Sequence, residues 1–210
     1  MQKKQPGISR RSFIKTVGSA GVGAALSPLV KRKTAQAAET AGVPTRPFGR
    51  SGIEVPILSL GGMFDIPSNQ TLLKQAIRWG VTYWDTAHIY SGGRSEEGIG
   101  HYFQRYPQDR EKIFLVTKST ARNPQGLSQD LAVSLKRMNT DSIDLFFVHA
   151  VHDAVDLDSQ IREWAKQQKA QGKIRLFGFS THSNMERCLT DAARMGWIDG
   201  IMTTYNFRLM

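Results

Sequence analysis

Residues 112–150 read KIFLVTKSTARNPQGLSQDLAVSLKRMNTDSIDLFFVHA, and this stretch decides the fold class. Its two ends are continuous apolar runs, which are typical of parallel strands covered on both faces. Between them, a stripe of residues at three- and four-residue spacing predicts an amphipathic helix: Leu127, Leu131, Ser134, Leu135 and Met138. A strand, a helix and a second strand in this order predict one parallel βαβ unit.

The same alternation extends through the chain in both directions. A hairpin is predicted at the N-terminal side, around GRSG, at residues 46–55. Strands are predicted at residues 56–62, 81–87, 112–119, 142–150, 174–181 and 199–207. Helices are predicted at residues 69–79, 95–106, 126–138, 157–172 and 183–197. Ser128 and Asn184 could serve as N-caps of two of these helices.

Alternating strands and helices predict a parallel sheet with helical crossovers, either an open doubly wound sheet or a barrel. A complete eight-stranded barrel takes about 250 residues, whereas residues 38–210 provide 173. Six strand–helix units are visible, and the chain stops just after the sixth strand. We therefore expect residues 46–210 to form part of a (β/α)8 TIM barrel that is truncated at its C-terminus after about six units.

The first 37 residues are predicted to be an export signal. SRRSFIK (residues 9–15) places a pair of arginines before an aromatic residue, and a Gly/Ala-rich apolar run follows at residues 16–30. AQA at residues 35–37 fits the small-residue rule for cleavage after Ala37. The resemblance to twin-arginine signals implies export of the folded protein by the twin-arginine translocase, a periplasmic location and no stable membrane span after cleavage. Residues 38–45, which are mostly small, are predicted to form a linker. An uncleaved helical anchor and a chance arginine pair are the alternatives.

The positive charge of the chain is concentrated in the same segment. The net charge is +10, but residues 1–37 hold eight of the 28 basic residues and no acidic residue, so the remainder has a net charge of +2. The basic excess belongs to the leader, and we expect no nucleic-acid-binding face. Cys188 is the single cysteine, which excludes an intrachain disulfide and leaves stability to a packed core.

Three successive strands are predicted to end in an ionisable residue, namely Asp85, Lys118 and His149. The carboxyl ends of the strands in a parallel barrel form one rim, and neighbouring strands are about 4.8 Å apart. Tyr90 lies in the loop that follows the strand of Asp85. We therefore expect these four side chains to be neighbours.

These four residue types suit proton transfer to a carbonyl oxygen. A phenol is a poor acid at neutral pH, but a nearby ammonium group stabilises the phenolate. Lys118 can supply that ammonium group next to Tyr90, and Asp85 can keep it charged, since an unpaired buried ammonium would be costly. His149 can hydrogen-bond a substrate oxygen or the phenol. None of the four can supply a hydride, so an external donor such as a nicotinamide is implied.

Four segments resemble, in order and in spacing, the signature blocks of the aldo/keto reductase family: YWDTAHIYSGGRSEEGIG, FLVTKS, DLFFVHA and GKIRLFGFS. The resemblance covers about residues 46–210. It implies a barrel whose base is closed by the hairpin, a catalytic tetrad of Asp85, Tyr90, Lys118 and His149, and NADP(H) lying across the carboxyl rim, with NAD possible. It also implies the reduction of an aldehyde or ketone, or oxidation of the alcohol, by hydride transfer with Tyr90 as general acid and base.

The residues that would contact the cofactor match the family less closely. The resemblance implies contacts from Gly62, Ser180, Thr181, Tyr205 and Asn206. The family usually has asparagine where this chain has Thr181, and commonly glutamine where it has Met202, and a methionine cannot donate to a carboxamide. In the family, the loops that bind the 2′-phosphate follow strands seven and eight, which are not among the six strands predicted here. The expected preference for NADP over NAD therefore rests on the resemblance alone.

Purely structural explanations exist for individual residues. Asp85 could cap a turn, and Arg94 could pair with Glu96 and Glu97. HAVH at residues 149–152 suggests a metal, but no second ligand cluster accompanies it, and we expect no metal site. The alternatives to an enzyme are a non-catalytic cofactor-binding barrel that acts as a sensor or subunit, and an incomplete fragment without activity.

Overall fold

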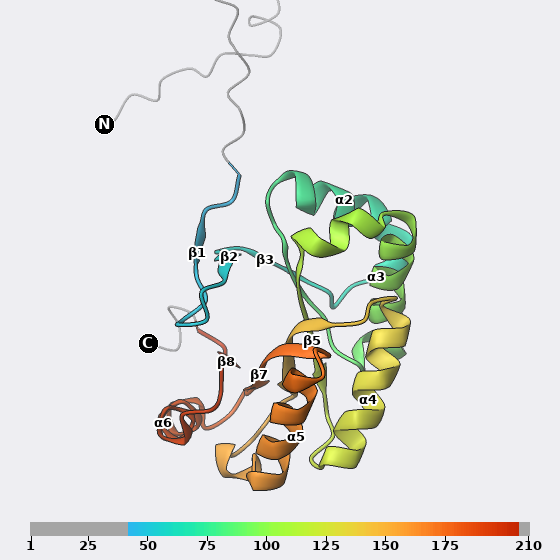
Figure 1. The fold of residues 1–210 in the computed structure, drawn as a ribbon. Coiled ribbons are helices and arrows are strands. Elements are labelled where there is room, and N and C mark those ends of the chain that lie inside the picture. The colour runs from blue at the N-terminus through green and yellow to red at the C-terminus, as the bar shows by residue number, and fades with distance from the viewer. Residues whose placement is uncertain (1–41, 206–210) are drawn as a thin grey trace, which may run out of the picture. The chain divides into compact units, whose positions relative to one another are not determined.

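The structure, a computed structural model, describes residues 42–205 (Figure 1). The predicted signal at residues 1–37, residues 38–41 of the predicted linker, and Asn206 lie outside the described residues. The later part of that linker is hydrogen-bonded to the domain, because the amide of Val43 donates to the carbonyl of Trp79 at 3.0 Å.

Within residues 42–205, six parallel strands form one sheet in which every strand pairs with its neighbours in the chain. The strands are β3 (Ser59–Gly61), β4 (Tyr83–Asp85), β5 (Phe114–Ser119), β6 (Ile143–Val148), β7 (Ile174–Ser180) and β8 (Gly200–Met202). A doubly wound sheet reverses its strand order at a switch point, and this sheet does not. The fold is therefore a curled, partial (β/α)8 barrel, and the predicted fold class is confirmed.

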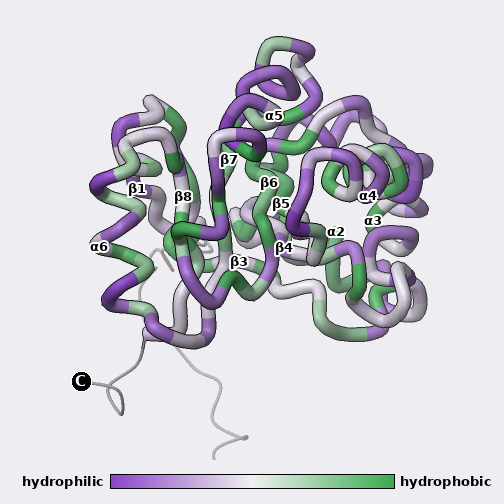
Figure 2. Tube along the Cα trace, turned by 90° about the horizontal axis from the view of Figure 1, so that it is seen from below, coloured by the Kyte–Doolittle hydropathy of each residue, from purple (hydrophilic) through white to green (hydrophobic). Residues whose placement is uncertain are grey.

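Helices connect the strands and lie along the outer side of the sheet (Figure 2). The α-helices are α2 (Gln70–Arg78), α3 (Arg94–Arg105), α4 (Pro124–Arg137), α5 (Ser159–Ala170) and α6 (Met185–Met195). Short 3-10 helices are η1 (Pro67–Asn69), η2 (Tyr90–Gly93), η3 (Pro107–Lys112) and η4 (Ala154–Asp156). Each of the five predicted helices is present. The buried stripe of α4, Leu127, Leu131 and Ser134, is the one that the spacing predicts.

Side chains alternate between two hydrophobic clusters, one on each face of the sheet. Leu115, Phe146 and Phe177 belong to the outer cluster, which packs against the helices. The inner cluster consists of Val55, Phe114, Val116, Leu145 and Phe147. Because successive residues of a strand point to opposite faces, the next inward positions at the carboxyl ends are occupied by Lys118, His149 and Ser180.

An antiparallel hairpin, β1 (Thr45–Pro47) and β2 (Glu54–Pro56), precedes the sheet. Gly49 and Gly52 in its turn have φ values of +56° and +73°, a region that glycine adopts without strain. Phe48 packs against Phe114, the first residue of β5, with ring centroids 5.5 Å apart. The hairpin therefore covers the inner cluster at the amino ends of the strands, and the carboxyl ends remain available for the site.

The helix starts differ from the predictions in two respects. The N-cap of α4 is Asn123, whose side chain accepts from the amide of Gly126 at 2.9 Å. Ser128 lies inside the helix and donates to the carbonyl of Pro124, so its predicted role as an N-cap is wrong. Asn184 does precede α6, but with φ 49° and no side-chain capping bond, since its amide nitrogen contacts His152 instead.

The two outermost strands, β3 and β8, each pair with a single neighbour within residues 42–205.

Over the same range, no helix combines the length and the apolar character that crossing a membrane requires. The core of the partial barrel is nevertheless closed on its outer side, where buried residues from all five α-helices contribute.

Candidate active site

The predicted rim residues come together at the carboxyl ends of β4, β5 and β6. Asp85 ends β4, Lys118 is the penultimate residue of β5, and His149 directly follows β6. The register pairs Asp85 with Val116, and Lys118 with Phe147, so the three ionisable residues lie on a diagonal across neighbouring strands. All three continue the inward-facing positions of their strands.

Lys118 is the centre of the site. Its ammonium group is buried, with a side chain that is 1% exposed. It donates to Oδ2 of Asp85 at 2.7 Å and to the carbonyl oxygen of Thr86 at 2.8 Å. It also lies 3.4 Å from the hydroxyl oxygen of Tyr90 and 4.9 Å from the centroid of that ring. A buried ammonium group needs such partners, and they direct it toward the phenol.

The carboxylate of Asp85 has fewer hydrogen-bond partners than the ammonium group of Lys118. Its Oδ2 accepts from Lys118, whereas its Oδ1 is buried without a partner among the described residues. Burial raises the pKa of the Asp85 carboxyl above its usual value, and the ammonium group of Lys118 opposes that rise. The pair is therefore held in an apolar environment where each charge depends on the other.

Tyr83 and Tyr90 are seven residues apart, and their surroundings differ. Burial, with the nearby carboxylate of Asp85, raises the pKa of Tyr83, which keeps its phenol neutral. Tyr90 is half-buried and faces the ammonium group of Lys118 rather than a carboxylate. Of the two phenols, Tyr90 is the one that contacts the ammonium group of Lys118.

His149 packs against Tyr90. The two rings are edge-to-face, with centroids 5.8 Å apart. Burial lowers the pKa of His149 to about 4, and the positive charges of Lys118, His182 and Arg122 add to this effect. The imidazole is therefore neutral near pH 7. Its Nδ1 is buried and has no hydrogen-bond partner in the part of the chain that the structure describes.

The loop that carries Tyr90 is bonded to the strand that carries Lys118. The amide of His88 donates to the carbonyl of Lys118 at 2.9 Å, and the amide of Thr86 donates to the carbonyl of Val116 at 2.9 Å. The amide of Tyr90 then donates to the carbonyl of Ala87 at 3.0 Å, which forms a turn. These backbone bonds extend the β4–β5 pairing to within two residues of Tyr90.

Of the residues predicted to contact a cofactor, Ser180 and Thr181 are buried at the carboxyl end of β7. The hydroxyl oxygen of Ser180 accepts from the amide of Ala150 at 2.9 Å, which leaves its own O–H able to donate to a ligand. The hydroxyl of Thr181 instead donates to the carbonyl of Ser183 at 2.6 Å. Tyr205 is 79% exposed. The cofactor contacts predicted for Ser180, Thr181 and Tyr205 remain predictions.

Gly62 has a structural reason to be glycine. A Cβ at this position would lie 2.8 Å from the carbonyl oxygen of Asp85 and 2.9 Å from Oγ of Ser95. The amide of Gly62 donates to that same carbonyl oxygen of Asp85, and its carbonyl accepts from Ser95. This close approach fixes the β3–α2 connection against β4, and the predicted cofactor contact of Gly62 remains a prediction.

Three contacts were not anticipated from the sequence. The backbone carbonyl of Thr86 is a partner of Lys118, and no side-chain pattern could indicate it. Arg94 pairs with Asp65 at 3.7 Å, and Glu96 with Arg137 at 3.2 Å, so the predicted pairing of Arg94 with Glu96 and Glu97 is wrong. Among residues 42–205, no group of three or more His, Cys, Asp or Glu side chains is arranged to hold a metal ion.

Comparison with known proteins agrees with this architecture. The sequence profile of the Aldo/keto reductase family matches residues 58–210. Two proteins of Schizosaccharomyces pombe are each 32% identical to the chain. One, named as a voltage-gated potassium channel subunit beta, matches over 162 residues, 69% of this chain and 47% of its own length. The other, aldo-keto reductase yakc [NADP(+)], matches over 158 residues, 66% of this chain and 45% of its own length.

The solved structures give the same result. The holo form of aldo-keto reductase AKR11C1 from Bacillus halodurans superposes with a TM-score of 0.67 at 25% identity, over 78% of this chain and 58% of that one. The chain spans about half the length of the curated relatives that it matches. The order of the strands, the inward-facing rim and the extent of the profile match lead to one conclusion: this chain belongs to the aldo/keto reductase family.

Proposed function

We propose that this chain is an NAD(P)-dependent oxidoreductase that reduces an aldehyde or ketone, or oxidises the corresponding alcohol, with Tyr90 as the general acid and base. The observation that carries the proposal is the position of the Lys118 ammonium group, 2.7 Å from Asp85 and 3.4 Å from the hydroxyl of Tyr90. Membership of the family supports the reaction class.

A nicotinamide cofactor fits the polar groups at the rim. The O–H of Ser180 is able to donate to a ligand, and Nδ1 of His149 is buried without a protein partner among the residues described. When bound, the nicotinamide supplies the hydride that no side chain of the site can supply. NADP is the first candidate because a relative carries NADP(+) in its name, and NAD is the second.

In the reductive direction, Tyr90 gives its hydroxyl proton to the carbonyl oxygen of the substrate. The ammonium group of Lys118 stabilises the phenolate that this transfer leaves behind. Asp85 keeps Lys118 charged and directs it, through the bond at 2.7 Å. In the oxidative direction the same phenolate takes the proton of the alcohol, so the roles reverse without any change of residues.

His149 acts as a neutral hydrogen-bond donor in this proposal. An imidazole with a pKa of about 4 carries one ring proton at neutral pH and can donate it to a substrate oxygen without transferring it. This assigns the orientation of the substrate to His149 and the transfer of the proton to Tyr90. The division follows from the burial of His149 and from the positive charges around it, because both disfavour a protonated imidazole.

A non-catalytic barrel that binds a cofactor as a sensor or subunit is the second candidate function. One relative is named as a channel subunit, which is the observation that favours it. The two functions differ in their dependence on the phenol, because a binding protein does not need an acid at position 90. The first prediction separates them.

Tyr90→Phe removes the proton donor and leaves the ring in place. We expect the rate of NADPH-dependent reduction of a small aromatic aldehyde, such as 4-nitrobenzaldehyde, to fall by about 10²–10⁴. The dissociation constant for NADPH, measured by fluorescence titration, should stay within about twofold. Tyr106→Phe, at the end of α3, is the matched control and should keep full activity. A wild-type chain that binds NADPH but reduces no carbonyl, or a Tyr90→Phe variant with an undiminished rate, contradicts the proposal.

The neutral state of His149 predicts how stability depends on pH. A histidine in the unfolded chain takes up its proton near pH 6.5, whereas His149 in the folded chain does so only near pH 4. Between these values the unfolded chain binds more protons, so the free energy of unfolding falls as the pH falls from about 6.5 to about 4. This contribution should be missing in His149→Gln, as measured by urea unfolding at several pH values.

His101→Gln, at an exposed histidine of α3, is the control for the loss of an imidazole. If wild type and His149→Gln lose stability in parallel over this pH range, folding does not lower the pKa of His149, and the imidazole is protonated below about pH 6.5. His149 would then compete with Tyr90 as the proton donor, and the assignment of roles would be wrong.

We also propose that residues 1–37 direct export through the twin-arginine route with the domain already folded. The support is the pattern SRRSFIK, the apolar run and the AQA site. Replacing Arg10 and Arg11 together by lysine keeps the charge and should abolish export in a bacterial host, because the receptor reads the arginines themselves. Arg32→Lys is the control and should be exported. Equal amounts of the double variant and of wild type outside the cytoplasm would contradict this assignment.

A further inference from the structure

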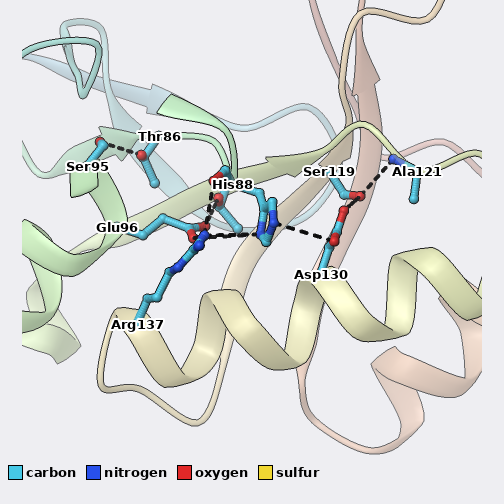
Figure 3. Close-up of polar contacts among 9 residues, drawn as sticks. Thr86, His88, Ser95, Glu96, Ser119, Ala121, Asp130 and Arg137 are labelled. Atoms are coloured by element: carbon cyan, nitrogen blue, oxygen red, sulfur yellow. Dashed lines mark hydrogen bonds and ion pairs between the residues drawn. The ribbon is translucent and has the colours of Figure 1, made fainter. Parts of the chain in front are cut away.

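A second group of polar side chains lies behind the candidate active site, between the sheet and helices α3 and α4 (Figure 3). Its members are Glu96, Arg137, His88 and Asp130. We propose that Glu96 and Arg137 are positioning residues, which fix the loop of Tyr90 against the strand of Lys118. The inference rests on the proposed function, because the group that they position is the proton donor.

Glu96 connects α3 to the strand that carries Lys118. Its carboxylate is fully buried, and Oε1 accepts from the hydroxyl of Thr117 at 2.6 Å. Thr117 immediately precedes Lys118 and faces the helices, while Lys118 faces the inside of the barrel. Oε2 of Glu96 accepts from Nη1 of Arg137 at 3.2 Å. A buried carboxylate is costly without such donors, so Glu96 holds both partners in place.

Arg137, the last residue of α4, connects Glu96 to the loop of Tyr90. Its Nη1 donates to the carbonyl oxygen of His88 at 3.1 Å, two residues before Tyr90. Its guanidinium also lies flat against Gly93, where an added Cβ would stand 2.3 Å from Cζ of Arg137. Gly93 has a φ of +96°, which glycine adopts readily. The loop is thus contacted by one guanidinium on both sides of Tyr90.

Asp130 makes a parallel connection on the other side of Lys118. One carboxylate oxygen accepts from the hydroxyl of Ser119, the residue after Lys118. The other lies 3.5 Å from Nε2 of His88. The residues that flank Lys118 and the residue two before Tyr90 are therefore joined through α3 and α4 in one connected network. Figure 3 shows the part of this network formed by Glu96, Arg137, His88, Asp130 and Ser119.

This arrangement explains why ionic side chains occupy the space behind the sheet. Well-packed apolar residues would fill it without the desolvation cost of buried charges. Apolar contacts are non-directional, however, and would not specify where His88 lies along β5. Directional bonds from Glu96 and Arg137 do, and the distance of 3.4 Å between Tyr90 and Lys118 depends on that register.

Arg137→Met tests the inference, since methionine keeps an unbranched apolar stem and removes the guanidinium. The kcat for aldehyde reduction should fall about 10–100-fold, because a displacement of about 1 Å can cost that much. The dissociation constant for NADPH should stay within about twofold. The amide of His88, which donates to the carbonyl of Lys118, should exchange its hydrogen at least about tenfold faster, while amides of β6 keep their protection.

Two control variants separate positioning from stability. Arg175→Met removes a guanidinium from another buried carboxylate, Asp144, which it contacts at 2.7 Å on the same sheet. Lys136→Met removes a charge from the same end of α4 at an exposed position. Neither should change the exchange of the His88 amide. Arg137→Lys should recover part of the kcat, because an ammonium group can reach one of the two acceptors.

The outcomes decide between the inference and the proposed function. If wild type reduces no carbonyl, the proposed function fails, and hydrogen exchange at His88 still tests the positioning. If Arg137→Met keeps its kcat and the protection of His88, the inference is overturned. If Arg137→Met does not fold, Glu96→Gln replaces it in the same two measurements, with the same expected changes.

Discussion

The buried ammonium group of Lys118 is the constraint on which the site depends. It is held by the carboxylate of Asp85, at the end of β4, and by the carbonyl of Thr86, the next residue. Their positions are set by the parallel pairing of β4 with β5, and so by the barrel itself. The phenol of Tyr90 then lies against a charge that cannot move away into water.

The same reasoning links the inner and outer faces of the sheet. Lys118 faces inward to Tyr90, while Thr117 and Ser119 face outward to Glu96 and Asp130. Three consecutive residues of β5 therefore contribute alternately to the candidate site on the inner face and to its supporting contacts on the outer face. The supporting residues come from α3 and α4, which a βαβ unit necessarily places behind β5.

The sequence predicted the fold well because its signals are local: the spacing of apolar residues, and the ionisable residues at the ends of strands. Each strand was visible as an apolar run, and Asp85, Lys118 and His149 stood out because charges rarely end buried strands. The partners of Glu96 could not be predicted, since Arg137 is 41 residues away and only helix packing brings it close. The capping role assigned to Ser128 failed because Asn123, followed by a proline, starts α4 earlier. Gly62 has a packing reason that no pattern could reveal.

A double-mutant cycle on Asp85→Asn and Lys118→Met, read as the rate of hydride transfer from NADPH in a single turnover, tests the central claim most directly. If Asp85 acts only by holding the ammonium group, Asp85→Asn slows wild type strongly but has almost no further effect once Lys118 is methionine. The double variant should then be about as slow as Lys118→Met alone. Effects of the two substitutions that multiply in full would show that they act independently, and would contradict the account.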